Sequence, residues 1–168
     1  MPSLRKIIMI LHVATSAGLI GGVLCFLVLA VAGLTGGTNL YAAADLIARL
    51  IVLPLASAAL AIGIVQSLVS PWGLVQHYWV IVKLVATAFV LAVLVLQLPG
   101  ITALGSMTVS EIALPQNASQ RLSLVLHAGT GLVPLALCLV LSIFKPKGLT
   151  PYGWRKTKGA LKSAMVRH

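Results

Sequence analysis

The chain has 168 residues, of which 60% are hydrophobic and 8% charged, and it carries a formal net charge of +10. A soluble domain has about a quarter charged residues, so this composition excludes water as the main solvent and predicts a membrane protein. A net charge this high would suggest nucleic acid as the partner of a soluble chain. Here the basic residues flank apolar segments, which excludes that partner.

Four apolar segments are long enough to cross a membrane, which takes about 20 residues of helix. Lipid admits only helices and closed barrels, and each segment is too long for a strand. The sequence therefore predicts an all-α protein, a four-helix transmembrane bundle of residues 1–145 followed by a basic tail of residues 146–168. The expected spans, in chain order, are residues 7–31, 50–69, 78–98 and 122–144.

Turn residues mark the connections between these spans. Residues 33–39 (GLTGGTN) and 70–73 (SPWG) are rich in Gly, Pro and Ser, and residues 98–120 are expected to form a longer polar loop that opens with LPG. Pro54 and Pro134 fall inside spans two and four. Neighbouring groups can satisfy the carbonyls that a proline frees in a membrane, so both prolines predict mild kinks.

The distribution of Lys and Arg predicts the orientation of the bundle. Ten of the 12 lie on the side of the two termini, counting Lys83 near the start of the third span. Arg49 and Arg121 lie on the other side, as do both acidic residues, Asp45 and Glu111. Because basic excess marks the cytoplasmic side, both termini are expected in the cytoplasm, and the chain is expected to be a multi-pass protein of the bacterial inner membrane.

The hairpin between spans two and three, residues 70–83 (SPWGLVQHYWVIVK), carries aromatic residues at the expected membrane surface. Trp72, Tyr78 and Trp79 are expected to settle among the lipid headgroups. The stem of Lys83 is long enough to carry its ammonium group back to the same level. These residues are therefore predicted to contact lipid at the interface.

The tail also combines aromatic and basic side chains. Tyr152 and Trp154 are expected to rest in the interface while neighbouring Lys and Arg contact anionic lipids at the cytoplasmic face, each worth about 1 kcal/mol. Two prolines and two glycines in residues 146–156 argue against a simple amphipathic helix. The open alternative is that the tail docks onto a cytoplasmic partner.

Three histidines are candidate ligands of haem b. His12 lies about five residues inside the first span and His77 lies in the hairpin, so the predicted topology puts both on the cytoplasmic side and makes them the leading axial pair. His127 lies inside the fourth span near the other face and is a further candidate. Ionisable residues inside a span are functional candidates by default. Each histidine is also compatible with a hydrogen bond to a neighbouring helix.

The sequence has few residues suited to metal binding, disulfide formation or acid–base catalysis. Zinc and copper sites need three or four Cys, His or carboxylate ligands, and Cys25 and Cys138 lie away from the histidines and near opposite ends of their spans. The same separation argues against a disulfide. Asp45 and Glu111 stand alone, so paired-carboxylate catalysis is not expected. The chain is therefore expected not to be an enzyme, unless bound haem gives it a redox role.

Small residues spaced four apart predict close helix packing. Such ridges let backbones approach one another in lipid, and they fit either a tight bundle or a homo-oligomer. Asp45 and Arg49, also four residues apart, are expected to form an ion pair on a helix surface. The ridges are formed by Gly18 with Gly22, Ala17 with Gly21, and Ala59 with Gly63.

Three stretches together resemble a widespread bacterial family of small, uncharacterised four-span integral membrane proteins, a domain of unknown function. They are residues 11–35 (LHVATSAGLIGGVLCFLVLAVAGLT), 63–85 (GIVQSLVSPWGLVQHYWVIVKLV) and 124–156 (LVLHAGTGLVPLALCLVLSIFKPKGLTPYGWRK). The resemblance implies the four-span architecture and brings no activity with it. The positions that match the family pattern are His12, Trp72, Gly73, His77, Tyr78, Trp79, Lys83, His127, Tyr152, Gly153 and Trp154.

Three functions fit this sequence. The favoured one is a non-enzymatic accessory or structural subunit that packs with itself or with a larger membrane complex, because packing ridges are abundant and reactive residues are sparse. The second is a b-type haem protein that transfers electrons. The third is a small transporter or channel subunit in which the intramembrane histidines and Lys83 line a polar path.

Overall fold

The computed structural model describes residues 2–36, 39–70, 72–146 and 148–165. The expectations that concern Pro71, Lys147 and the last three residues of the tail lie outside this described part. The secondary structure of the described residues is helical, apart from one isolated antiparallel bridge between His77 and Leu149. The elements are α1 (Pro2–Leu34), α2 (Leu40–Ile47), the π-helix η1 (Ala48–Val52), α3 (Leu53–Val69), α4 (Tyr78–Ser106), α5 (Val109–Ala113), the 3-10 helix η2 (Pro115–Asn117), α6 (Ala118–Phe144) and α7 (Pro151–Met165).

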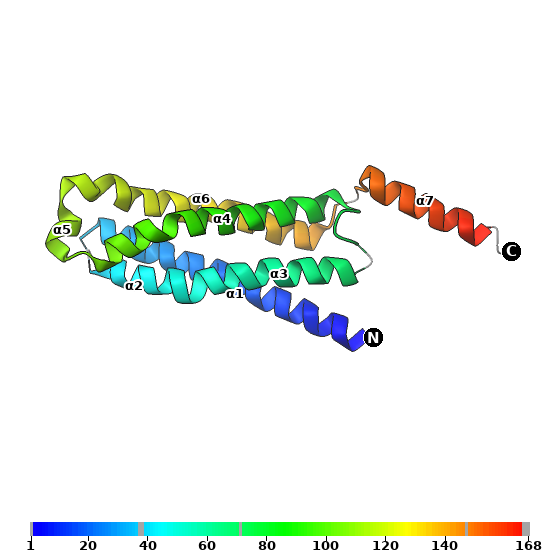
Figure 1. Ribbon diagram of the computed structural model, residues 1–168, viewed down its shortest axis with the longest axis horizontal. Helices are drawn as coiled ribbons and strands as arrows, with labels where there is room; N and C mark the ends of the chain where they lie inside the picture. Colours follow the sequence, from blue (N-terminus) through cyan, green and yellow to red (C-terminus); the bar gives the residue numbers. More distant parts are fainter. Residues whose placement is uncertain (1, 37–38, 71, 147, 166–168) are drawn as a thin grey trace.

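Four helical stretches are long and apolar enough to cross a membrane, which confirms the expected number of apolar helices. They run up and down in turn, so that the start of α1 and the end of α6 lie at the same end of the bundle, and α7 extends beyond that end (Figure 1). We call it the basic end, and we call the other, which carries α5, the opposite end. The four stretches are Ser3–Leu34, Leu40–Val69, Tyr78–Ser106 and Pro115–Phe144.

Each long helix packs against two neighbours, which closes the bundle. α1 packs against α3 and α6, α4 packs against the same two helices, and α2 lies between α1 and α4. The interior holds two apolar clusters. The one toward the opposite end consists of Phe26, Ala30, Tyr41, Ala44, Ala48, Ile101, Leu104, Ile112, Leu124 and Ala128. The other consists of Leu19, Val23, Val52, Ala56, Ala59, Val90 and Leu135.

The second apolar helix begins at Leu40 rather than at residue 50, because residues 40–52 are helical and continue directly into α3. Its two charged residues, Asp45 and Arg49, are paired with each other. The expected ion pair is therefore confirmed, and it lets a charged segment extend an apolar helix. The sequence analysis predicted the pair but began the span at residue 50, because it did not extend an apolar span across charged residues.

The predicted loop of residues 98–120 is also largely helical. α4 continues through Pro99 to Ser106, and α5, η2 and the first turn of α6 occupy most of the remainder. A proline removes one backbone hydrogen bond without ending a helix that packed neighbours support. One such neighbour is the side chain of Gln120 on α6, whose Nε2 donates to the carbonyl of Gly100 at 2.9 Å.

The predicted disturbance at Pro54 takes the form of a π turn. The backbone N–H of Leu53 bonds to the carbonyl of Ala48, five residues earlier, just before the proline. This wider turn gives the proline ring room against the preceding turn of helix. Pro134 lies inside α6, which remains a continuous helix.

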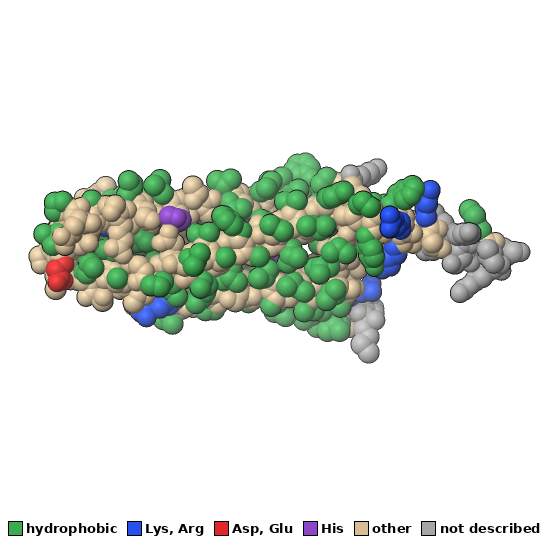
Figure 2. Space-filling view, turned by 45° about the horizontal axis from the view of Figure 1, so that its top comes forward, with side chains coloured by type: hydrophobic (Ala, Val, Ile, Leu, Met, Phe, Trp, Pro, Cys, Tyr) green, Lys and Arg blue, Asp and Glu red, His purple; other side chains and the backbone are tan. Residues whose placement is uncertain are grey.

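The outside of the bundle is apolar along its length. Figure 2 shows hydrophobic side chains over the long helices, most of the visible Lys and Arg at the basic end, further basic side chains toward the opposite end, and an acidic patch at that opposite end. Leu96 is 79% exposed and Phe144 76% exposed, and exposed apolar side chains of this kind recur along all the long helices, a larger apolar surface than soluble monomers expose. The surface therefore has the chemical banding expected of a multi-pass membrane protein.

The prediction that residues 146–156 do not form a simple helix was wrong from Pro151 onward. α7 begins at Pro151. The N–H groups in the first turn of a helix make no hydrogen bond within the helix, so a proline there costs none. Gly153 is required there because a Cβ would lie 2.4 Å from the carbonyl oxygen of Gln76. Pro151 is therefore compatible with the start of this helix and Gly153 is required by it, so neither residue argues against a helix here.

Candidate functional site

Lys83 on α4 is held by α6. Its Nζ donates to Ser142 Oγ at 2.7 Å, and Ser142 donates in turn to the carbonyl of Cys138. Ser142 lies two residues before the end of α6, so the amine reaches toward the basic end, as expected of a snorkelling lysine. The same Nζ lies 5.7 Å from the centre of the Trp79 ring. The lysine thus joins two helices instead of extending into lipid.

Cys138 belongs to the same contact between α4 and α6. Its Sγ lies 4.0 Å from Thr87 Oγ1 and donates to the carbonyl of Lys83 at 3.8 Å. Cys25 is exposed on α1, and both thiols are free. Cys138 therefore acts as a small polar packing residue.

His12 packs against α3. A Cβ on Gly63 would lie 2.9 Å from His12 Cε1, so the imidazole rests on the bare backbone of that glycine. His12 Nδ1 is buried and has no hydrogen-bond partner among the described residues. Gly63 lies six residues before the end of α3 and Lys83 five residues after the start of α4, and these two helices pack together. His12 and Lys83 therefore lie at a similar level of the bundle.

Two further buried atoms lack partners at this level. Gln66 Oε1 and Trp79 Nε1 make no hydrogen bond within the described residues. Gln66 follows Gly63 by three residues on α3, and Trp79 precedes Lys83 by four on α4. Gln66 therefore shares a helix face with Gly63, and Trp79 shares one with Lys83. A buried polar group left unpaired costs about 1–3 kcal/mol. We call His12, Gln66, Trp79, Lys83 and Ser142 the axial polar cluster.

His77 lies in the hairpin, where it forms the N-cap of α4. Its Nδ1 donates to the carbonyl of Trp72 at 2.8 Å, and its ring centre lies 5.1 Å from that of Trp72 and 6.3 Å from that of Trp79. The backbone bridge to Leu149 fixes it from the tail side. His77 is therefore part of the structural core of the hairpin.

No described contact joins His12 to His77, since His12 packs on Gly63 and His77 packs on Trp72 and Trp79. His12 lies level with Gly63, six residues before the end of α3 at Val69, or about 9 Å of helix. Axial ligands bind opposite faces of one porphyrin, so both rings would have to leave their present contacts. Haem ligation by this pair stays a prediction.

His127 on α6 is exposed, yet both of its ring nitrogens have partners. Nδ1 donates to the carbonyl of Ser123 at 2.7 Å, and Nε2 lies 2.9 Å from Gln97 Nε2 of α4. The amide N–H of Gln97 donates to this ring nitrogen, which fixes the tautomer protonated at Nδ1. His127 can bind a haem iron only if Gln97 moves away.

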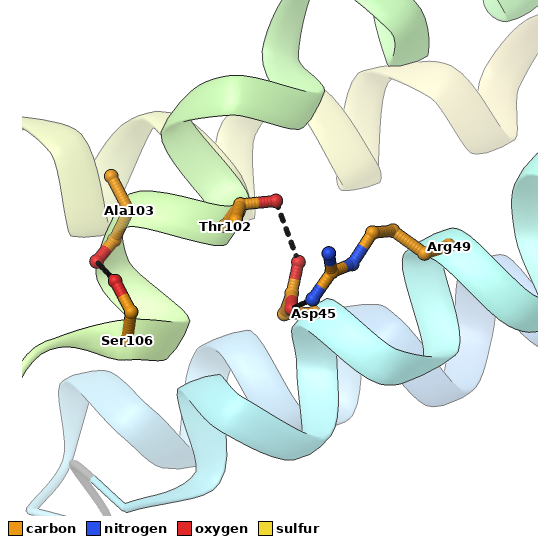
Figure 3. A network of polar contacts seen from close by, with 5 residues as sticks. All are labelled: Asp45, Arg49, Thr102, Ala103 and Ser106. Atoms are coloured by element: carbon orange, nitrogen blue, oxygen red, sulfur yellow. Dashed lines mark hydrogen bonds and ion pairs between the residues drawn. The ribbon is translucent and has the colours of Figure 1, made fainter.

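The opposite end has a polar network of its own (Figure 3). Asp45 on α2 pairs with Arg49 and accepts a hydrogen bond from Thr102 Oγ1 of α4 at 2.9 Å. Gly105 allows this approach, because a Cβ there would lie 2.8 Å from Asp45 Cβ. The network joins α2 to α4. The groove beside it is lined by Arg49, Val95, Leu98, Pro99, Thr102 and Ala103.

The residues predicted to contact lipid divide into two groups. Trp72, Tyr78, Tyr152 and Trp154 are 40–57% exposed, at the basic end where an interface is expected. Lys83 and Trp79 form the other group, because Lys83 binds Ser142 of α6 and Trp79 is 9% exposed and packs inward. The ring centre of Trp79 lies 5.8 Å from that of Trp72. The side chain of Trp79 thus faces the bundle rather than lipid.

Thr150 joins the tail to the hairpin. Its backbone N–H donates to the carbonyl of Gln76 at 2.9 Å, and its hydroxyl donates to the carbonyl of Val75 at 2.7 Å. The same hydroxyl accepts the N–H of Gly153 at 3.1 Å and so caps α7. Thr150 is 6% exposed. α7 is therefore fixed to the hairpin through backbone bonds.

No group of three or more His, Cys, Asp and Glu side chains that could hold a metal ion exists within the described ranges. The sequence analysis did not single out several polar residues that make the contacts above. The one signal that marks most of them is a polar side chain inside an apolar span. These residues are Gln66, Gln97, Thr102, Ser142 and Thr150.

Comparisons with protein-family models, curated proteins and solved structures found no match to this chain. The family resemblance therefore rests on the quoted sequence motifs alone. A function for this chain has to be argued from its own geometry.

Proposed function

We propose that this chain is a non-enzymatic inner-membrane protein, an accessory or structural subunit that packs with itself or with a larger membrane complex through the outer faces of α1 and α6. The exposed position of His127 carries the proposal. Ionisable side chains inside transmembrane helices almost always face protein or water. A second protein surface over α6 meets that requirement.

His127 lies well inside the apolar stretch Pro115–Phe144, ten residues past the N-cap of α6, or about 15 Å along the helix. Thr130, close to one turn further on, is also exposed, and its hydroxyl donates to the carbonyl of Leu126 in the same helix. The amide of Gln97 has a second N–H and an oxygen beyond its bond to the histidine. This side of the bundle therefore offers polar contacts at membrane depth.

The small residues of α1 divide between an inner and an outer face. A Cβ on Gly18 would lie 3.2 Å from Leu55, and one on Gly22 would lie 3.3 Å from Ile51, so this ridge packs inside the bundle. A Cβ on Gly21 would meet nothing within 4 Å, and the ridge that Gly21 forms with Ala17 is exposed. The outer ridge supports association with another helix.

α6 has small residues without close neighbours as well. A Cβ on Gly129 or on Gly131 would meet no atom within 4 Å. Because α1 and α6 pack side by side, their open small residues supply neighbouring surfaces for one partner. The charge distribution supports an orientation with the basic end in the cytoplasm, where its Lys and Arg meet anionic lipids (Figure 2).

The test compares two alanines exposed on different helices. Ala17→Ile adds bulk to the outer ridge of α1, whereas Ala88→Ile adds the same bulk to an exposed position of α4. Self-association of the full chain in vesicles is measured by energy transfer between labelled copies, and association with other proteins is measured by cross-linking in native membranes.

We expect Ala17→Ile to weaken association about tenfold and Ala88→Ile to leave it unchanged. Equal effects of the two substitutions would contradict a specific α1 surface. Single copies in vesicles, together with no cross-linked partner in native membranes, would overturn the proposed function.

A further inference from the structure

Lys83 carries a charge that the chain does not balance. The only two acidic residues in the sequence are Asp45 and Glu111. Both lie toward the opposite end and are already engaged, Asp45 by Arg49 and Glu111 by Thr108. An ammonium group in a membrane-spanning helix needs an anion or a strongly polar partner, and Ser142 supplies one neutral oxygen.

A second cation lies close to the first. Lys145 directly follows α6, three residues after the Ser142 that binds Lys83, so the positive potential of the two lysines adds at the basic end. No carboxylate of the described chain lies near enough to pair with either. The missing counter-charge therefore has to come from outside the chain.

The donors beside Lys83 suit an oxyanion. One N–H of the ammonium group goes to Ser142, and two others remain. The indole N–H of Trp79, one turn earlier on α4, is buried without an acceptor. A phosphate group accepts several such bonds at once, and charge-assisted bonds of this kind are stronger than neutral ones.

Two further residues of the axial polar cluster, His12 and Gln66, have buried polar atoms without hydrogen-bond partners among the described residues. His12 Nδ1 can donate in the neutral ring, and the amide of Gln66 can present either its N–H groups or its oxygen. Residues of α1, α3 and α4 thus bring unpaired polar atoms to one level of the bundle. A bundle that binds no ligand there would be expected to have apolar side chains at that level. Unpaired buried groups cost free energy that hydrogen bonds to a ligand would recover, so their presence at one level favours a bound ligand.

We propose that the axial polar cluster binds a phosphate-class oxyanion, with Lys83 as its cationic anchor and the Trp79 indole as a neutral donor. Two sources fit this chemistry, the headgroup of an anionic phospholipid at the basic end and free phosphate. Basic pockets between transmembrane helices are established sites for lipid headgroups. The site is independent of the association surface on α1 and α6.

The test uses the full chain, delipidated in neutral detergent. Phosphatidylglycerol and phosphatidylcholine with identical acyl chains are titrated, and the retained lipid is counted by native mass spectrometry. In a parallel arm, inorganic phosphate is titrated and the unfolding temperature is measured. The variants are Lys83→Gln and Trp79→Phe. Their matched controls are Lys156→Gln and Trp154→Phe, at exposed positions of α7.

We expect the parent chain to bind phosphatidylglycerol at least about tenfold more tightly than phosphatidylcholine. Lys83→Gln should abolish this preference and Trp79→Phe should reduce it, and each control should change it less than the matched cluster variant does. A response to inorganic phosphate that Lys83→Gln removes identifies free phosphate as a ligand, whereas a response to lipid alone identifies the headgroup.

Equal lipid preference in the parent chain and in both cluster variants overturns the proposal, as does the absence of any response to lipid and to phosphate. If Lys83→Gln does not fold, Trp79→Phe decides the matter, because it keeps the aromatic ring and the lysine and removes only the N–H donor.

Discussion

The imidazole of His12 on α1 lies directly on the backbone of Gly63 on α3, where a Cβ would come within 2.9 Å of Cε1. This contact explains why a glycine occurs in the middle of a helix, at a position where it costs about 1 kcal/mol relative to alanine. It also places the histidine side chain between α1 and α3. The small-residue pattern of Ala59 and Gly63 therefore serves a side chain rather than a bare helix–helix contact.

Gly63→Ala should destabilise the bundle by about 1–3 kcal/mol, because the new methyl group overlaps the half-buried ring of His12, which would have to shift. Reversible unfolding of the detergent-solubilised protein measures the change. Gly129→Ala is the matched control, since a Cβ there meets nothing within 4 Å, and it should be neutral or slightly stabilising.

The pair can be tested for direct coupling. His12→Ala removes the ring that the methyl group strikes, so Gly63→Ala should cost markedly less in that background, with a coupling free energy of about 0.5–3 kcal/mol. Strict additivity of the two substitutions would show that the ring does not rest on Gly63.

Thr102→Val should destabilise the contact between α2 and α4. The substitution keeps the shape of the side chain but leaves Asp45 Oδ1 without the donor that lies 2.9 Å away, at a cost of about 1–3 kcal/mol. Thr130→Val serves as the control, because that exposed hydroxyl bonds only to carbonyls of its own helix. Similar losses in unfolding free energy for both variants would rule out a special role for the bond to Asp45.

The four apolar helices were predictable because each is a continuous run of apolar residues, and this signal does not depend on long-range contacts. Their ends were not. The second span was predicted to begin at residue 50 rather than at Leu40. The pair of Asp45 with Arg49 was expected from their spacing, but the bond from Thr102, which joins this segment to α4, becomes visible only once the chain is folded.

The polar partners were beyond sequence reasoning for a related reason. Lys83 and Ser142 lie 59 residues apart and Thr150 and Val75 lie 75 apart, so no local spacing connects them. The sequence identified Lys83 correctly as an unusual residue and predicted that it would snorkel. It contains no signal that selects Ser142 from the other serines as the acceptor.

Thr150→Val should loosen α7 from the hairpin. The change removes both the hydroxyl that donates to Val75 and the cap that accepts from Gly153, and loss of a helix cap alone costs about 1 kcal/mol. Backbone amides in the first turns of α7 should then exchange with deuterium at least about fivefold faster. Thr157→Val is the control, because its hydroxyl bonds within α7, and it should leave exchange unchanged. Unaltered exchange in Thr150→Val would show that the tail is held in another way.

The short helix α5 should respond to acid through Glu111. Its carboxylate accepts the backbone N–H of Thr108 at 2.8 Å and the hydroxyl of the same residue at 2.7 Å, and these bonds lower the pKa of Glu111 below its ordinary value. A carboxyl group with a lowered folded-state pKa stabilises the fold above its ordinary pKa of 4.5, and this contribution is lost as the pH falls through the folded pKa. Amide exchange in Val109–Ala113 should therefore be protected at pH 6 and lose that protection in acid. Glu111→Gln keeps an acceptor oxygen without a titrating group, so its protection should not change over the same range, and an acid response in that variant would assign the effect to another residue.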